Sequence, residues 1–205
     1  MSSGLLFYWF SWILWIVTTF FMAKSKLRTI LSCWLLLLIL FSGFDVTIEH
    51  MQLSVSFLVL LAGALVLHAR LAVIVFHVFC SITIMIGYTG VLIWESFTPL
   101  KLFLPPFLTI SCILFVLVMI TTTGLWNRLA CSLLGMSGGE LLYSIIMSGY
   151  SIAAPIGDKR FLDFILVITM ALLSHDLLRT LNMKIIRKLQ QSIPGPKPLF
   201  RKKAQ

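Results

Sequence analysis

Charged residues are scarce in this 205-residue chain, and their scarcity narrows the class of protein. Acidic and basic residues together make up 11% of the sequence, whereas soluble domains contain about 25%. Hydrophobic residues make up 60%, and they gather in runs of about 20, the length that crosses a bilayer core about 30 Å thick. We therefore predict an integral membrane protein. Nucleic acid is not an expected partner, despite a formal net charge of +9.

Signatures of catalysis and of metal binding are also missing. The sequence contains no HExxH, no P-loop, no GxSxG and no GxGxxG after a strand. Its 4 cysteines (Cys33, Cys80, Cys112 and Cys131) fall inside apolar runs, without CxxC pairs or zinc-ligand spacing. We therefore expect no disulfide, no metal, no cofactor and no catalytic residues, and predict that the protein is not an enzyme.

Apolar segments separated by short polar connectors predict an all-α, polytopic bundle of transmembrane helices. Seven such segments lie at roughly residues 4–23, 29–44, 51–68, 71–94, 104–123, 129–156 and 161–178. A turn is expected near His68–Leu71, because one helix over residues 51–94 would be about 66 Å long, too long for a single crossing. Pro105 and Pro106 are expected to start the fifth helix, where their missing N–H groups cost little. No Lys or Arg precedes the first segment, so we expect a retained span and not a cleavable signal peptide.

Basic residues orient the predicted spans, because Lys and Arg accumulate in cytoplasmic connectors. Seven spans with the N-terminus outside place 13 of the 16 basic residues in the cytoplasm and leave only Lys101, Lys159 and Arg160 outside. Five spans is the alternative count that also keeps the C-terminus in the cytoplasm. We divide the chain into a transmembrane domain, residues 1–178, and a basic amphipathic tail, residues 179–205.

Glu140 is an acid in the middle of an apolar segment, about eleven residues into the sixth predicted span. An ionised side chain there costs at least about 2.5 kcal/mol, so such residues usually face a partner or a wet cavity. The residue is either a proton or cation site, or a protonated side chain that ties two helices together. Gly135 and Gly139, four residues apart, predict a face on which another helix packs closely.

Two further residues complete the candidate intramembrane polar site. Tyr143 lies three residues after Glu140, and His77 lies in the fourth segment. His77 reaches Glu140 only if the two helices are shifted in height. Near the outer end of the last span, Asp163 is expected to pair with Lys159 or Arg160.

The tail is strongly basic and has the periodicity of an amphipathic helix. Leu177, Leu181, Ile185 and Leu189 recur every four residues, and charged residues share the remaining surface. We expect this helix to continue the last span and lie against anionic lipid, although a partner-binding tail has the same composition. Its lipid-facing basic residues are Lys184, Arg187, Lys188, Arg201, Lys202 and Lys203.

The opening of the chain, Phe7-Tyr-Trp-Phe-Ser-Trp-Ile-Leu-Trp-Ile-Val-Thr-Thr-Phe-Phe-Met22 followed by Lys24-Ser-Lys-Leu-Arg28, resembles the start of the YphA/SeaA family. Members of that family are small multi-pass membrane proteins of endospore-forming bacilli. The chain's length, predicted span count and basic tail are also similar to those of the family. The resemblance implies a bacterial cytoplasmic-membrane protein with a role in spore envelope assembly.

These observations leave two functions open. The first is a non-catalytic assembly or scaffold role, with membrane-protein partners or a second copy of the chain bound in the membrane. The second is a small proton- or ion-coupled transporter that uses Glu140. An intramembrane lipid-modifying enzyme ranks behind both, because catalysis of that kind needs more than one intramembrane acid.

Overall fold

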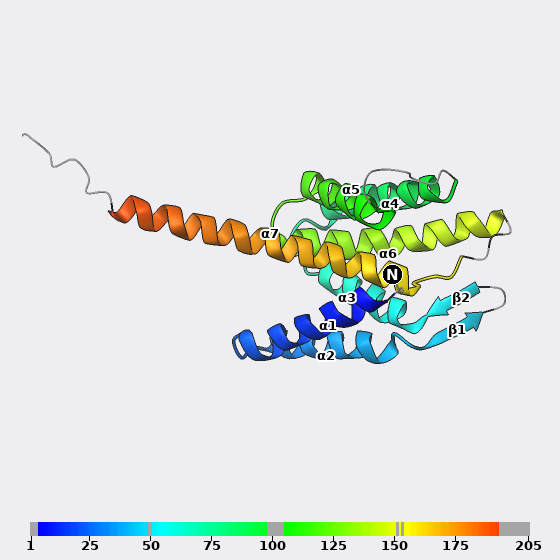
Figure 1. Ribbon diagram of the computed structural model, residues 1–205, viewed down its shortest axis with the longest axis horizontal. Helices are drawn as coiled ribbons and strands as arrows, with labels where there is room; N and C mark the ends of the chain where they lie inside the picture. Colours follow the sequence, from blue (N-terminus) through cyan, green and yellow to red (C-terminus); the bar gives the residue numbers. More distant parts are fainter. Residues whose placement is uncertain (1–3, 49–50, 98–104, 151, 153, 193–205) are drawn as a thin grey trace, which may run out of the picture. The chain divides into compact units, whose positions relative to one another are not determined.

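The structure is a computed structural model that describes residues 4–48, 51–97, 105–150, 152 and 154–192, with side chains for all of these except 48, 51 and 188–192. Helices dominate it, as the sequence predicts, and each of the seven apolar segments contains one (Figure 1). The elements are α1 (Leu5–Ile16), η1 (Val17–Phe21, a π-helical end), α2 (Lys26–Phe41), β1 (Asp45–Ile48), β2 (Met51–Ser54), α3 (Val55–His68), α4 (Ile74–Phe97), α5 (Pro106–Thr121), α6 (Leu125–Gly149) and α7 (Lys159–Ser192). The chain divides into two compact units, Met1–Leu172 and Leu173–Gln205.

Local sequence signals explain where several helices begin and end. Helix α2 begins after Ser25, whose hydroxyl accepts a hydrogen bond from the backbone N–H of Arg28 at 3.2 Å, a serine N-cap. Helix α5 begins at Pro106, as the Pro-Pro pair predicts. The chain turns between His68, the end of α3, and Ile74, the start of α4, which confirms the turn predicted there.

A short β-hairpin replaces the predicted start of the third span. Strands β1 and β2 pair antiparallel, and Ile156 adds a parallel bridge to Leu53. Both strands alternate polar and apolar residues, a period-two pattern that favours extended chain over helix. The predictions that residues 51–54, 150, 152 and 154–156 belong to helical spans are therefore wrong, and residues 151 and 153 lie outside the described residues. Helix α3 begins only at Val55, and α6 ends at Gly149.

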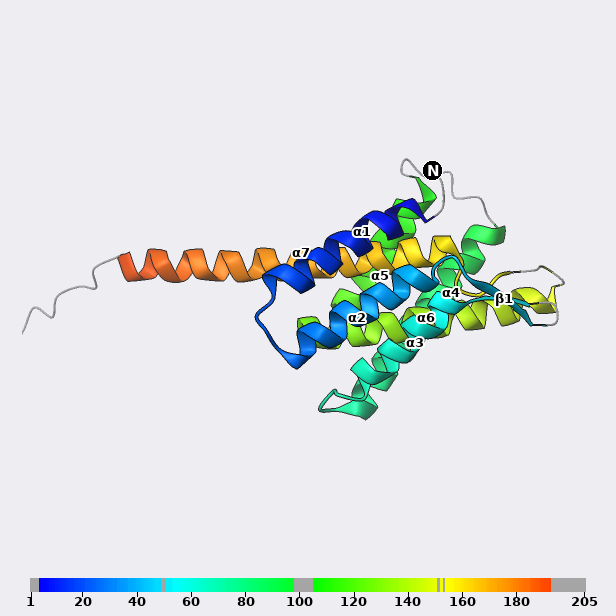
Figure 2. The same cartoon turned by 90° about the horizontal axis from the view of Figure 1, so that it is seen from below.

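Successive helices of the first unit run in alternating directions (Figures 1 and 2). At one end, here called the pocket end, the starts of α1, α5 and α7 meet the end of α4. The contacts there are hydrogen bonds from the backbone N–H groups of Gly4 and Phe7 to Asp163, an ion pair between Arg160 and Glu95, and stacked rings of Phe107 and Phe164 at 4.6 Å. Asp163 therefore caps α1 instead of pairing with Lys159 or Arg160 as expected.

The opposite end carries the basic connectors and is called the basic end. Residues from the first turn of α2, from the turn between α3 and α4 and from the first turn of α6 line one groove there. Because the directions alternate, α4 and α6 run parallel to each other. Figures 1 and 2 show α6 running beside α4 and α3.

Helices α4 and α6 approach so closely that a side chain would not fit at two glycines of α6. A Cβ atom on Gly135 would lie 2.7 Å from the backbone oxygen of Ser81, and one on Gly139 would lie 2.8 Å from Cδ1 of Tyr88. Such glycines let two helix backbones approach in a membrane protein. The pair spaced four residues apart thus lies on the surface that packs against α4.

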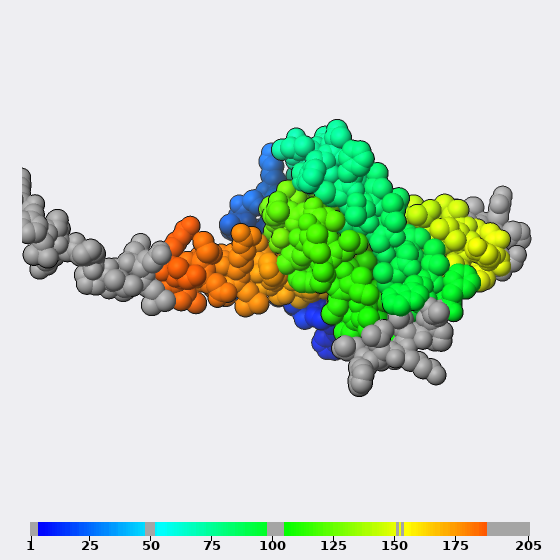
Figure 3. Space-filling view, turned by 90° about the horizontal axis from the view of Figure 1, so that it is seen from above, coloured from blue at the N-terminus to red at the C-terminus, as the bar shows by residue number. Residues whose placement is uncertain are grey.

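Among the residues that the structure describes, three helices are long and apolar enough to cross a membrane by length and composition: Ile74–Phe97, Leu125–Gly149 and Lys159–Arg187. The helices Leu5–Phe21, Val55–His68 and Pro106–Thr121 are apolar but shorter. Figure 3 shows α4 and α5 together at the surface, and many of the exposed side chains of these two helices are large and apolar, among them Phe79, Ile86, Val116 and Ile120. Such a surface is expected against lipid and not against water.

Replacing Gly139 with alanine tests the close contact between α4 and α6. Gly139→Ala should destabilise the protein by about 1–3 kcal/mol, because the new methyl group overlaps the Tyr88 ring and the backbone oxygen of Met85. The measurement is thermal unfolding in detergent. Gly90→Ala in α4 is the matched control, since no atom lies within 4 Å of its added Cβ. Equal melting temperatures for both variants would contradict the packing.

Candidate functional site: a polar pocket around Glu140

Glu140 lies in the second half of α6, fifteen residues after Leu125 and nine before Gly149. Its side chain is buried, with 5% of the residue exposed, and its Oε2 accepts a hydrogen bond of 2.8 Å from the Tyr88 hydroxyl. Tyr88, in α4, is 1% exposed. This acid in an apolar helix is therefore joined to the neighbouring helix by a buried hydrogen bond, which is the arrangement that a buried polar group requires.

Glu140 also borders a cavity of about 210 Å³ at the pocket end. A water molecule occupies about 30 Å³ in the liquid, so the cavity has room for several waters or a small solvated ion. Its polar lining comes from α4, α6, the residue before α7 and the first turn of α7: Tyr88, Glu95, Ser96, Glu140, Tyr143, Asp158 and Arg160. The carboxyl group is thus placed between a neighbouring helix and a polar space.

Acidic groups outnumber cations around this cavity. Arg160 pairs with Glu95, and its guanidinium lies 5.6 Å from the centre of the Phe164 ring. Asp158 accepts a hydrogen bond of 2.8 Å from the backbone N–H of Phe161 and caps the start of α7. Three carboxyl groups, those of Glu95, Asp158 and Glu140, therefore share one cationic side chain, and the cavity favours a proton or a small cation over an anion.

The structure brings two of the three predicted polar-site residues to this cavity. Tyr143 lines it, and its hydroxyl lies 2.8 Å from the Ser96 hydroxyl. His77 does not line it: its Nδ1 lies 2.6 Å from the backbone oxygen of Val73, and it precedes Tyr88 on α4 by eleven residues, about 16 Å along the helix. Sequence reasoning missed Tyr88, whose only signal is a phenol in the middle of an apolar helix.

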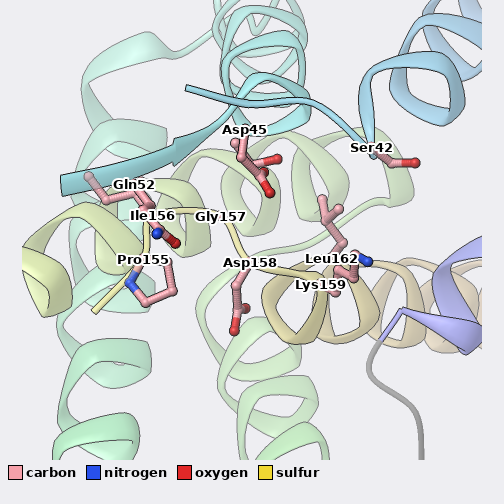
Figure 4. A pocket seen from close by; sticks show the side chains of 10 residues that line it. Ser42, Asp45, Gln52, Pro155, Ile156, Gly157, Asp158, Lys159 and Leu162 are labelled. Carbon is pink, nitrogen blue, oxygen red and sulfur yellow. The ribbon is translucent and has the colours of Figure 1, made fainter. Parts of the chain in front are cut away.

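A second polar pocket of about 210 Å³ shares Pro155 and Asp158 with the first. Figure 4 shows it between the β-hairpin, which contributes Asp45 and Gln52, and the segment that leads into α7. Gly157 allows the segment that leads into α7 to pass close against Phe57 of α3. Its φ is +73°, and a Cβ there would overlap the Phe57 side chain.

The predicted basic tail is described only in part. Lys184 and Arg187 are exposed residues of α7, and α7 continues without a break to Ser192. The side chain of Lys188 and the whole of Arg201, Lys202 and Lys203 lie outside the described residues. Over the part of the chain that the structure describes, no group of three or more His, Cys, Asp or Glu is placed to hold a metal ion.

A double-mutant cycle on Tyr88 and Glu140 tests the buried hydrogen bond. Tyr88→Phe and Glu140→Leu should each destabilise the protein, and their effects should be coupled by about 0.6–2 kcal/mol, the range for hydrogen bonds between membrane helices. The measurement is the free energy of unfolding in mixed micelles. Tyr143→Phe with Ser96→Ala is the matched control, because that hydroxyl pair is exposed. Fully additive effects at Tyr88 and Glu140 would show that the hydrogen bond contributes nothing.

Comparison with known proteins agrees with the resemblance seen in the first 28 residues. Residues 3–197 match the model of the family described as YphA-like integral membrane protein. The protein YphA of Bacillus subtilis (strain 168) is 25% identical over 158 residues, which cover 77% of this chain and 79% of that protein. No solved structure matches. Because the family match extends over nearly the whole chain, including every described helix, this protein belongs to the family of YphA-like integral membrane proteins.

Proposed function

We propose that the protein crosses the bacterial cytoplasmic membrane seven times, with its N-terminus outside and its C-terminus in the cytoplasm. The alternating directions of the helices support this topology, because each connector then returns the chain to the opposite end. The basic end, with Lys24, Lys26, Arg28, Arg70 and Arg128, is then cytoplasmic. Helices shorter than about 20 residues are accommodated by local thinning of the bilayer, at a modest cost.

Within this topology, we infer a non-catalytic assembly or scaffold role in the membrane, in assembly of the spore envelope. The observation that carries this proposal is the continuity of α7, which runs for 34 residues from apolar sequence into a basic amphipathic helix. In the second unit, the exposed apolar residues Leu177, Leu181 and Ile185 share this helix with Arg179, Lys184 and Arg187. Such a helix binds an anionic lipid surface or the acidic, apolar face of a partner.

The polar pocket favours a second function, a small proton- or ion-coupled transporter. Glu140 is a buried carboxyl group that borders a polar cavity, and titratable groups inside a membrane commonly mark ion pathways. The cavity's small volume suits a proton or a small cation and not a large solute. In this proposal Tyr88 orients the carboxyl group, and Arg160 balances part of the negative charge.

Two variants in one deletion strain separate the two functions. The tail variant combines Lys184→Gln, Arg187→Gln and Lys188→Gln, and removes about 1 kcal/mol of attraction to an anionic surface per residue. Under the assembly proposal it should lower sporulation efficiency and recovery of cross-linked partners. Glu140→Gln should leave sporulation efficiency and partner recovery unchanged when the variant accumulates to the normal protein level. A Lys184→Arg, Arg187→Lys and Lys188→Arg variant, which keeps all three charges, is the matched control.

The opposite outcome supports transport. The assembly role would be contradicted if the tail variant kept normal sporulation efficiency and partner recovery while the Glu140→Gln variant, although inserted in the membrane, lost them. Ion- or proton-coupled uptake into proteoliposomes, lost on Glu140→Gln and kept in the tail variant, would establish the transporter in its place.

A further inference from the structure

An apolar groove of about 700 Å³ lies at the basic end of the first unit and shares no lining residue with the polar pocket. Helices α2 and α3 form its two walls, and the first turn of α6 closes one end. Its apolar lining includes Leu31, Trp34, Ala62, Gly63, Val66 and Trp126. The volume falls within the range of about 300–1,000 Å³ that is typical of small-molecule sites.

The floor of the groove is fixed by a tryptophan and a glycine. The Trp34 indole lies against Gly63 so closely that a Cβ there would overlap its ring. Its N–H donates a hydrogen bond of 2.9 Å to the backbone oxygen of Val59, so the polar atom of the indole is satisfied within the protein. The surface left facing the groove is hydrocarbon. Val66 and Trp126 are about half exposed, so the groove opens at the surface of the protein.

Polar groups occur at one end of the groove only. They belong to Arg70, in the turn between α3 and α4, and to Asn127, in the first turn of α6. Arg70 is exposed, and the described residues include no ion pair with its guanidinium. The same end of the protein carries the basic residues of the first connector. A ligand that matches this lining has a long apolar part and one anionic group at its end.

We propose that the groove binds a phospholipid with an anionic headgroup, its acyl chain along Trp34 and Gly63 and its phosphate beside Arg70. Basic pockets between membrane helices on the cytoplasmic side bind such headgroups. Trp126 lines the groove together with Arg70, and tryptophan is favoured at the boundary between headgroups and acyl chains. A peptide segment fits less well, because the walls offer no row of hydrogen-bonding groups. This site is independent of Glu140 and of the tail.

Native mass spectrometry of the full-length protein in detergent tests the proposal, with phosphatidylglycerol and phosphatidylcholine of identical acyl chains as probes. The protein should retain phosphatidylglycerol in preference to phosphatidylcholine. Arg70→Gln should weaken phosphatidylglycerol binding by about fivefold, the effect of one charge near an anionic headgroup. Lys26→Gln, a charge at the same end that does not line the groove, should change it little.

Filling the groove separates this site from general contact with lipid. Ala62→Trp should abolish retention of both lipids, whereas Leu65→Trp, on the same helix but outside the groove, should not. Equal retention of the two lipids, or binding unaffected by Arg70→Gln and Ala62→Trp, would overturn the proposal. Loss of a dimer on Ala62→Trp, with lipid binding unchanged, would show that a second copy covers the groove instead. Melting temperatures of all variants should match, so a loss of binding does not reflect unfolding.

Discussion

The close contact between α4 and α6 is the constraint on which the rest of the described structure depends. Gly135 and Gly139 leave no side chain between the helices, so the backbone oxygens of Ser81 and Met85 lie almost against α6. The short separation between α4 and α6 fixes the rotation of each helix and their relative height. Tyr88 then meets Glu140, and the Thr89 hydroxyl reaches the backbone oxygen of Gly139 at 2.9 Å. A wider separation would break the buried hydrogen bond between Tyr88 and Glu140, which is costly in an apolar surrounding.

The same contact explains why the polar pocket lies where it does. Two parallel helices need the chain to return between them, and α5 makes that return from the pocket end to the basic end. The ends of α4 and α6 therefore lie together at the pocket end, where α7 begins. Arg160 and Asp158, from the start of α7, then meet Glu95 from the end of α4. The basic residues left at the other end give the protein the charge asymmetry that orients membrane proteins.

Hydrophobic run length and local signals predict the helices well. The seven apolar segments each contain a helix, Pro106 starts α5, and the turn after His68 is where helix length requires one. The β-hairpin was missed because its strands are four residues each and adjoin an apolar helix. Their pairing with Ile156 depends on a contact about a hundred residues away in sequence, and no local pattern encodes it.

The candidate site could be predicted only in part, for a similar reason. An acid in an apolar segment identifies Glu140 from sequence alone, and small residues four apart identify its packing face. Which side chain reaches that acid depends on the relative rotation and height of two helices. Tyr88 and His77 lie on the same helix, and only the register set by Gly135 and Gly139 brings Tyr88 to the acid. Asp163 likewise caps α1, more than 150 residues earlier, instead of pairing with its neighbours.

Disulfide cross-linking between α4 and α6 in native membranes tests the central claim most directly. A Cβ on Gly138 would lie 3.5 Å from Cγ of Met85, so cysteines at these positions are close enough to form a disulfide. In a background with the four native cysteines replaced by alanine, Met85→Cys with Gly138→Cys should form an intramolecular disulfide under mild oxidation and resist labelling with maleimide. Met85→Cys with Gly149→Cys should stay reduced, because no side chain approaches Gly149. Equal labelling of the two pairs, or disulfides only between separate chains, would contradict the packing of α4 on α6.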